Sequence, residues 1–138
     1  MKENYILDVC ALIAYFKKET GFETMLRFFD SSCGGEISLY MHRLNLLEVY
    51  YGFYRDDGKE NAEIVLNDSL SLPITYINDL GTPIFREAGR LKALYDIPFA
   101  DSFALSLASL RREPLVTADH HEFEAIEQKE PIRFSWIR

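Results

Sequence analysis

The chain has 138 residues, enough for one domain and too few for two of ordinary size. Hydrophobic residues make up 48% and charged residues 27%, a mixture typical of a soluble globular protein, and no apolar run reaches the length of a membrane span. Two cysteines are too few for a disulfide framework and favour a reduced, cytoplasmic setting. A net charge of −7 argues against binding nucleic acid by simple attraction to phosphate, unless divalent cations neutralise part of the acid.

Short apolar runs alternate with longer amphipathic runs along the chain. This alternation favours an α/β fold in a single domain over residues 1–138, with a parallel β-sheet sandwiched between α-helices. We expect strands near Tyr5–Leu7, Ile37–Met41, Ile74–Ile77, Leu115–Thr117 and Arg133–Trp136. We expect helices near Ala11–Lys18, Met25–Asp30, Arg43–Tyr54, Asn61–Leu70, Thr82–Tyr95, Phe99–Arg112 and His121–Gln128, with breaks at 31–35 and 56–58.

Two acids come just after predicted strands. Asp8 follows the first strand directly, and Asp119 lies two residues beyond Thr117. The carboxyl ends of parallel strands form the edge where α/β proteins bind ligands. Both positions also suit a helix N-cap, and Asp119 with Glu122 approaches a capping box, so the sequence leaves either role open. Thr117 is either a hydroxyl that orients a carboxylate or water, or an ordinary β-branched strand residue.

Asp101 lies on the apolar side of a predicted helix. Serines at 102, 106 and 109 form a polar stripe, and Asp101 lies roughly 80–140° away from it, on the side of Ala104 and Leu105. A carboxylate turned toward an apolar face must be paired, protonated or bound to a metal. The structural alternative is that Asp101 caps the helix or interacts with its dipole from the first turn.

Glu48 shows the same anomaly on another helix. Its neighbours one turn away are Leu44, Tyr51 and Gly52, and the glycine leaves open space beside the carboxylate. An acid among apolar side chains is costly unless a positive charge compensates it. The structural alternative is that Arg43 or another basic residue supplies this charge in place of a metal ion.

The four acids together indicate a cation site. Histidines and cysteines have no zinc-site spacing, and the chain has neither a phosphate-binding loop nor a nucleophile elbow. Hard cations such as Mg²⁺ bind carboxylate oxygens, polarise a phosphoryl group and lower the pKa of an attacking water. We therefore predict that folding brings together Asp8, Glu48, Asp101 and Asp119 as catalytic, metal-binding residues.

Four stretches resemble PIN domains, and more narrowly the VapC-like toxins of bacterial toxin–antitoxin pairs. They cover residues 5–14, 45–52, 99–108 and 115–123, in an order and spacing that span most of the chain. The resemblance implies Mg²⁺ or Mn²⁺ held mainly by Asp8 and Asp101, with Glu48 and Asp119 assisting. It further implies an RNA substrate, a homodimer and a small antitoxin partner. The lack of a long apolar run separately predicts no membrane partner. Cys10 departs from the family, which usually has Ser, Thr or Asn there, and a thiol is a weaker hydrogen-bonding partner.

The leading hypothesis is a metal-dependent endoribonuclease that acts as a toxin. The cations available to steer RNA are Lys17, Lys18, Arg43, Arg86, Arg90, Lys92, Arg111 and Arg112, although such residues more often form a solvated helix face. A second hypothesis is a catalytically idle PIN fold that binds a partner, motivated by the acidic composition and by Cys10. A phosphoacceptor receiver or phosphatase ranks third, because Asp8-Val9-Cys10 lacks the second acid that a phosphatase needs.

Overall fold

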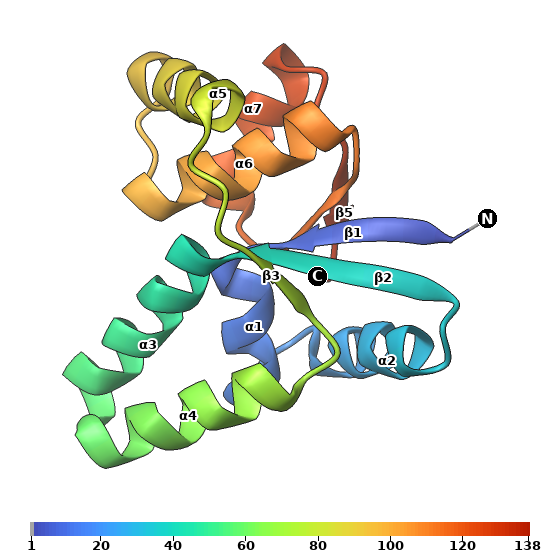
Figure 1. Cartoon of the computed structure of the whole chain (residues 1–138), viewed down its shortest axis with the longest axis vertical. Coiled ribbons are helices and arrows are strands. Elements are labelled where there is room, and N and C mark those ends of the chain that lie inside the picture. The colour runs from blue at the N-terminus through green and yellow to red at the C-terminus, as the bar shows by residue number, and fades with distance from the viewer. Residues whose placement is uncertain (1) are drawn as a thin grey trace.

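Five strands form one parallel sheet in a computed structural model that describes residues 2–138 (Figure 1). The strands are β1 (Glu3–Leu7), β2 (Ile37–His42), β3 (Thr75–Ile77), β4 (Leu115–Thr117) and β5 (Phe134–Trp136). Their order in the sheet is β3-β2-β1-β4-β5, and all four pairings are parallel. The predicted α/β class with a parallel sheet is confirmed.

Helices cover both faces of the sheet, as predicted (Figure 1). One face carries α1 (Val9–Phe16), α2 (Phe22–Cys33), α3 (Arg43–Asp57) and α4 (Lys59–Ser71). The other face carries α5 (Thr82–Leu94), α6 (Phe99–Arg111) and α7 (His120–Lys129). Each face has its own hydrophobic core, and the sheet separates the two. Within residues 2–138, no helix has both the length and the apolar character that crossing a membrane requires.

Two predicted breaks were placed too early. The structure keeps residues 31–33 in α2 and residues 56–57 in α3. The chain leaves these helices at glycines, where Gly35 has φ +79° and Gly58 has φ +92°. Glycine adopts this left-handed region without the steric penalty of a Cβ, so glycine ends the helices and the polar residues before it do not.

The chain reverses its direction of travel across the sheet between β1 and β4. From β1 the chain proceeds outward to β2 and β3, and β4 and β5 then add on the other side. Ile6 pairs with Tyr40 of β2 and with Leu115 of β4, so β1 lies at the centre. In open parallel sheets, the crevice beyond the carboxyl ends of the strands at such a switch point is the usual ligand site. Asp8 follows β1 there, and its backbone N–H donates to the Val116 carbonyl at 3.3 Å.

Candidate active site

Asp8 is the N-cap of α1, which confirms the N-cap interpretation, and it lies at the switch point of the sheet, where the sequence placed it. Its Oδ1 accepts a hydrogen bond from the Ala11 backbone N–H at 2.8 Å, and its Oδ2 accepts one from the Thr117 hydroxyl at 2.5 Å. The side chain is buried. Burial raises the pKa of Asp8 to about 7, against the two hydrogen bonds, and the charges of Asp119 and Glu48 raise it further.

Asp101 is buried in the first turn of α6. Its side chain does not cap the helix, because the N-cap residue is Pro98. Burial raises the pKa of Asp101 to about 8, and the nearby charges of Asp8 and Glu48, together with those of Asp119 and Glu122, contribute in the same direction. Burial and these four acidic charges all raise that pKa, and no ion pair within residues 2–138 involves the Asp101 carboxyl, so its charged form is poorly compensated.

The polar stripe of serines on the same predicted helix as Asp101 packs inside the protein. Ser102 and Ser106 are buried, and the Ser106 hydroxyl donates to the Ile84 carbonyl of α5 at 3.4 Å. Ser109 donates to the Glu87 carboxylate of α5 at 2.6 Å. α6 is therefore buried on nearly all sides, and its polar stripe contacts α5.

Glu48 is half-buried on α3. Burial raises the pKa of its carboxyl, while hydrogen bonding with the Tyr51 hydroxyl and the charge of Arg55 lower it. Of the predicted alternatives, Arg43 or another basic residue, the cation that lowers the pKa of Glu48 is therefore another basic residue, Arg55. A Cβ on Gly52 would meet only the Arg55 guanidinium, at 3.9 Å, which confirms open space beside the acid.

Asp119 is half-buried and caps α7. Its carboxylate accepts a hydrogen bond from the Glu122 backbone N–H at 3.1 Å, so the N-cap interpretation is confirmed. Its own N–H donates to the Thr117 hydroxyl oxygen at 3.0 Å. Thr117 therefore links Asp119 to Asp8. Of its two predicted roles, the structure confirms the hydroxyl that orients a carboxylate.

Asp8, Glu48 and Asp119 lie close enough to Asp101 for their charges to raise its pKa. None of the ion pairs of residues 2–138 involves any of them. In that same part of the chain, no three Asp, Glu, His or Cys side chains converge tightly enough to enclose a metal ion by themselves. The donor set fits Mg²⁺ bound through one or two carboxylates with water and phosphate completing its shell, and it does not fit an all-protein cage.

Cys10 is half-buried on the first turn of α1. Burial raises the pKa of its thiol to about 12, and the charges of Asp8 and Asp119 act in the same direction. The side chain of the metal-free protein is therefore a neutral thiol near neutral pH.

One buried polar residue near the site was missed from sequence. Asn45 lies on α3, three residues before Glu48, and is fully buried. The Asn-x-x-Glu spacing, which places both side chains on neighbouring positions of one helix face, was the available signal.

Several of the cations predicted to steer RNA have structural partners. Arg90 pairs with Glu87 at 2.8 Å and with Glu130 at 2.7 Å, and Arg111 pairs with Glu113. Lys92 donates to the Ile97 carbonyl. Other predicted cations, Arg43, Arg86 and Arg112, are exposed and have no ion pair with an acid of residues 2–138.

A sequence profile of the PIN domain matches residues 5–129. The chain belongs to the PIN-domain family. No curated protein matches the chain.

Solved structures extend this likeness over nearly the whole PIN domain. The DNA-bound VapBC of Salmonella typhimurium is 21% identical, with a TM-score of 0.73 and all of both chains covered. VapBC2 of Rickettsia felis, bound to a promoter DNA fragment, is 18% identical, with a TM-score of 0.71 and 96% and 97% covered. VapC20 of Mycobacterium tuberculosis, a sarcin-ricin loop cleaving toxin, is 13% identical, with a TM-score of 0.68 and 88% and 94% covered. At these identities the likeness establishes the fold.

Proposed function

We propose that this PIN domain is a Mg²⁺-dependent endoribonuclease, with Mn²⁺ as an alternative metal, that hydrolyses RNA phosphodiester bonds. The observation that carries the proposal is the state of Asp8 and Asp101. Both carboxyls are buried at the switch point of the sheet, and the pKa of each is raised by burial and by neighbouring acids. Desolvated, mutually repelling carboxylates are stabilised by a bound divalent cation, which supplies the missing positive charge.

The resemblance to PIN domains supplies the proposed role of each residue, and hydrogen bonds and burial support these roles. Asp8 and Asp101 are the main ligands, and Glu48 and Asp119 assist. Thr117 holds Asp8 in one orientation, and the N-cap bond to Ala11 fixes the other oxygen. The metal supplies Lewis-acid polarisation of the phosphoryl oxygen and a lowered pKa for the attacking water. Because ligand carboxylates must be deprotonated, metal binding displaces the protons that the raised pKa values favour.

An RNA cleavage assay tests the proposal, with Mg²⁺, Mn²⁺ or chelator in separate lanes. We expect Asp101→Asn to reduce cleavage by at least about a hundredfold, and chelator to abolish it. The matched control is Asp68→Asn, which neutralises an exposed acid on α4. Equal cleavage by the wild type, by Asp101→Asn and in chelator would refute the assignment.

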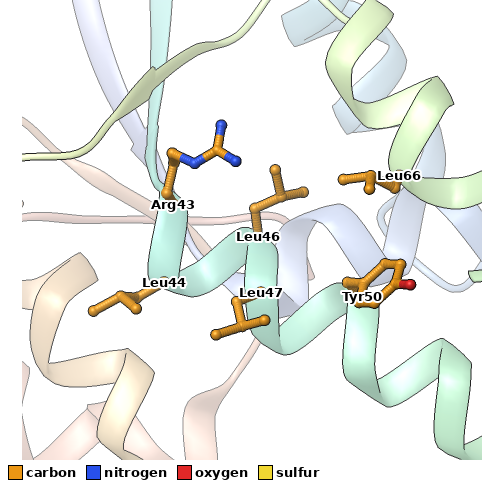
Figure 2. Close-up of a pocket in the computed structure, with 6 residues that line it drawn as sticks. All are labelled: Arg43, Leu44, Leu46, Leu47, Tyr50 and Leu66. Atoms are coloured by element: carbon orange, nitrogen blue, oxygen red, sulfur yellow. The ribbon is translucent and has the colours of Figure 1, made fainter. Parts of the chain in front are cut away.

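We further propose that the nuclease is a cytoplasmic toxin that forms a homodimer and is silenced by a small antitoxin. The support is that its structural relatives include VapBC toxin–antitoxin complexes. A groove of about 310 Å³ also runs between α3 and α4 (Figure 2), lined by Arg43, Leu44, Leu46, Leu47, Tyr50 and Leu66. Leu46 and Tyr50 lie about 160° from Glu48 around α3, whereas Leu44 lies only about 40° from it, so the groove extends from the far side of α3 toward the side that carries Glu48.

Growth measurements and light scattering test the toxin proposal. Induced expression should arrest growth with the wild type and spare it with Asp101→Asn. Light scattering should give twice the monomer mass. Normal growth with the catalytically active protein would rule out the toxin role, and the nuclease assignment would remain.

The second candidate is a catalytically idle PIN fold that binds a partner. Cys10 and the absence of a tight three-residue ligand group within residues 2–138 favour it. Calorimetric titration with Mn²⁺ discriminates the two functions. An idle domain should bind no more Mn²⁺ than the Asp8→Asn control binds, whereas the nuclease should bind at least one ion that the control does not.

A further inference from the structure

Asn45 is a buried amide without a hydrogen-bond partner. Its side chain is 0% exposed, and neither Nδ2 nor Oδ1 finds a partner within residues 2–138. A buried amide without hydrogen bonds costs roughly 1–3 kcal/mol. Such a cost is consistent with a partner that comes from outside the chain.

The polar groups at this end of the sheet already have other partners. His42 accepts from the Leu44 N–H through Nδ1, and its Nε2 contacts the Asp79 carbonyl at 2.9 Å. Ser102 donates to the Phe99 carbonyl, and Thr117 donates to Asp8. None of these groups hydrogen-bonds the Asn45 side chain.

Asn45 lies on the part of α3 between Glu48 and the end of β2. On α3 it lies three residues before Glu48, about 60° around the helix and about 4.5 Å nearer the helix start. α3 begins directly after β2, whose carboxyl end is beside that of β1, where Asp8 lies. Asn45 is thus one turn closer than Glu48 to the edge of the sheet that carries Asp8, on a similar side of the helix.

Ser69 provides an internal comparison, because its hydroxyl is also buried without a partner. Ser69 lies on α4, in the core between helices, and a serine hydroxyl rotates readily toward the carbonyl one turn earlier in its own helix. The planar amide of Asn45 has two donors and two acceptor lone pairs to satisfy, and neither of its polar atoms has a partner within residues 2–138. The buried amide of Asn45 therefore leaves more hydrogen bonds unmade than the single hydroxyl of Ser69.

We propose that Asn45 is a positioning residue of the acidic site, whose amide hydrogen-bonds a water in the hydration shell of the bound divalent cation. This inference rests on the proposed metal-dependent nuclease. Mg²⁺ usually keeps several of its waters, and protein groups that orient such outer ligands strongly affect affinity. Asn45 thereby fixes the cation between Asp8, Asp101 and Glu48, which do not enclose it by themselves.

Mn²⁺ calorimetry with thermal unfolding of the metal-free protein tests the inference. Asn45→Leu keeps the shape and removes every polar atom. We expect its Mn²⁺ Kd to rise at least about tenfold, while its metal-free Tm stays the same or increases. Asn45→Asp, which keeps an acceptor oxygen, should retain Mn²⁺ binding close to that of the wild type. Ser69→Ala is the matched control and should leave the Kd unchanged.

The outcomes separate this inference from the proposed function. If the wild type binds Mn²⁺ more tightly than Asp8→Asn, but Asn45→Leu binds within twofold of the wild type, the role of Asn45 is refuted and the metal site stands. If the wild type binds no more Mn²⁺ than Asp8→Asn, both are refuted. If Asn45→Leu does not fold, Asn45→Ala replaces it. A Mn²⁺ Kd at least about tenfold higher than that of the wild type then supports the inference, and a Kd within twofold of the wild type refutes it.

Discussion

The Thr117 hydroxyl donates a hydrogen bond to Oδ2 of Asp8 at 2.5 Å, between residues 109 positions apart in the chain. The bond crosses the switch point, because Asp8 follows β1 and Thr117 ends β4. The same hydroxyl accepts the Asp119 N–H. One side chain therefore sets the geometry of two of the four acids.

Removing this hydroxyl should weaken metal binding. Thr117→Val keeps the shape of the side chain and removes the donor to Asp8, so the pKa of Asp8 should rise above that of the wild type. We expect a loss of about 1–2 kcal/mol in the free energy of unfolding and about a tenfold higher Mn²⁺ Kd. Thr117→Ser should restore both values in calorimetry and denaturant unfolding. Unchanged Mn²⁺ affinity in Thr117→Val would show that the bond has no part in binding.

The metal-free protein should lose stability as pH rises. Asp8 and Asp101 have pKa values of about 7 and about 8 in the folded chain, above those of unfolded Asp. The folded state then binds more protons than the unfolded state between about pH 4 and pH 8, so the free energy of unfolding falls across that range. We expect the two titrations together to lower the free energy of unfolding by roughly 6 kcal/mol between pH 5 and pH 8, measured in chelator.

Neutral variants and metal provide the controls for that pH profile. The free energy of unfolding of Asp101→Asn should change less with pH than that of the wild type, because the variant lacks one of the two titrating groups. Saturating Mn²⁺ should restore stability at pH 8, because the cation binds the deprotonated form. A stability that is constant or rises with pH in chelator would contradict the raised pKa values.

Sequence predicted the fold and the acids more readily than their surroundings. Asp8 and Asp119 follow strands directly, so the parallel topology alone brings them to one edge. Asp101 and Glu48 were marked by the cost of an acid on an apolar helix face. Asn45 was not selected, because an asparagine on a helix is unremarkable until its burial and missing partners are known. Arg90 was selected as an RNA cation, since its partner Glu130 is 40 positions away.

Gly52→Ala should stabilise the protein. Gly52 lies within α3, where alanine is favoured over glycine by about 0.8–1.0 kcal/mol, and the new Cβ meets only the flexible end of Arg55. Gly89→Ala on α5, where a Cβ meets nothing, is the matched control and should gain a similar amount. If RNA uses the open space beside Glu48, only Gly52→Ala should raise KM. A loss of stability in Gly52→Ala would contradict the open space.

Arg90 should contribute to stability and not to RNA binding. It contacts Glu87 on α5 and Glu130 after α7, and Tyr95 also donates to Glu130. Because Arg90 is partly exposed, we expect Arg90→Gln to lower the free energy of unfolding by only about 1 kcal/mol. The salt dependence of RNA binding should match that of the wild type. A shallower salt dependence in Arg90→Gln would instead assign this cation to phosphate contacts.

Phe99 should contact RNA beside the scissile phosphate. Its ring is 63% exposed, lies two residues before Asp101 and meets Phe103 edge-on at 5.3 Å between ring centroids. Stacking of a base on an exposed aromatic ring is worth about 1–3 kcal/mol, so Phe99→Ala should raise KM for single-stranded RNA by about 5- to 100-fold and change kcat little. Phe85→Ala on α5, where the ring is 72% exposed, is the control and should leave KM unchanged. Equal KM values for Phe99→Ala and the wild type would place the bound bases elsewhere, because the variant removes the exposed ring nearest in sequence to Asp101.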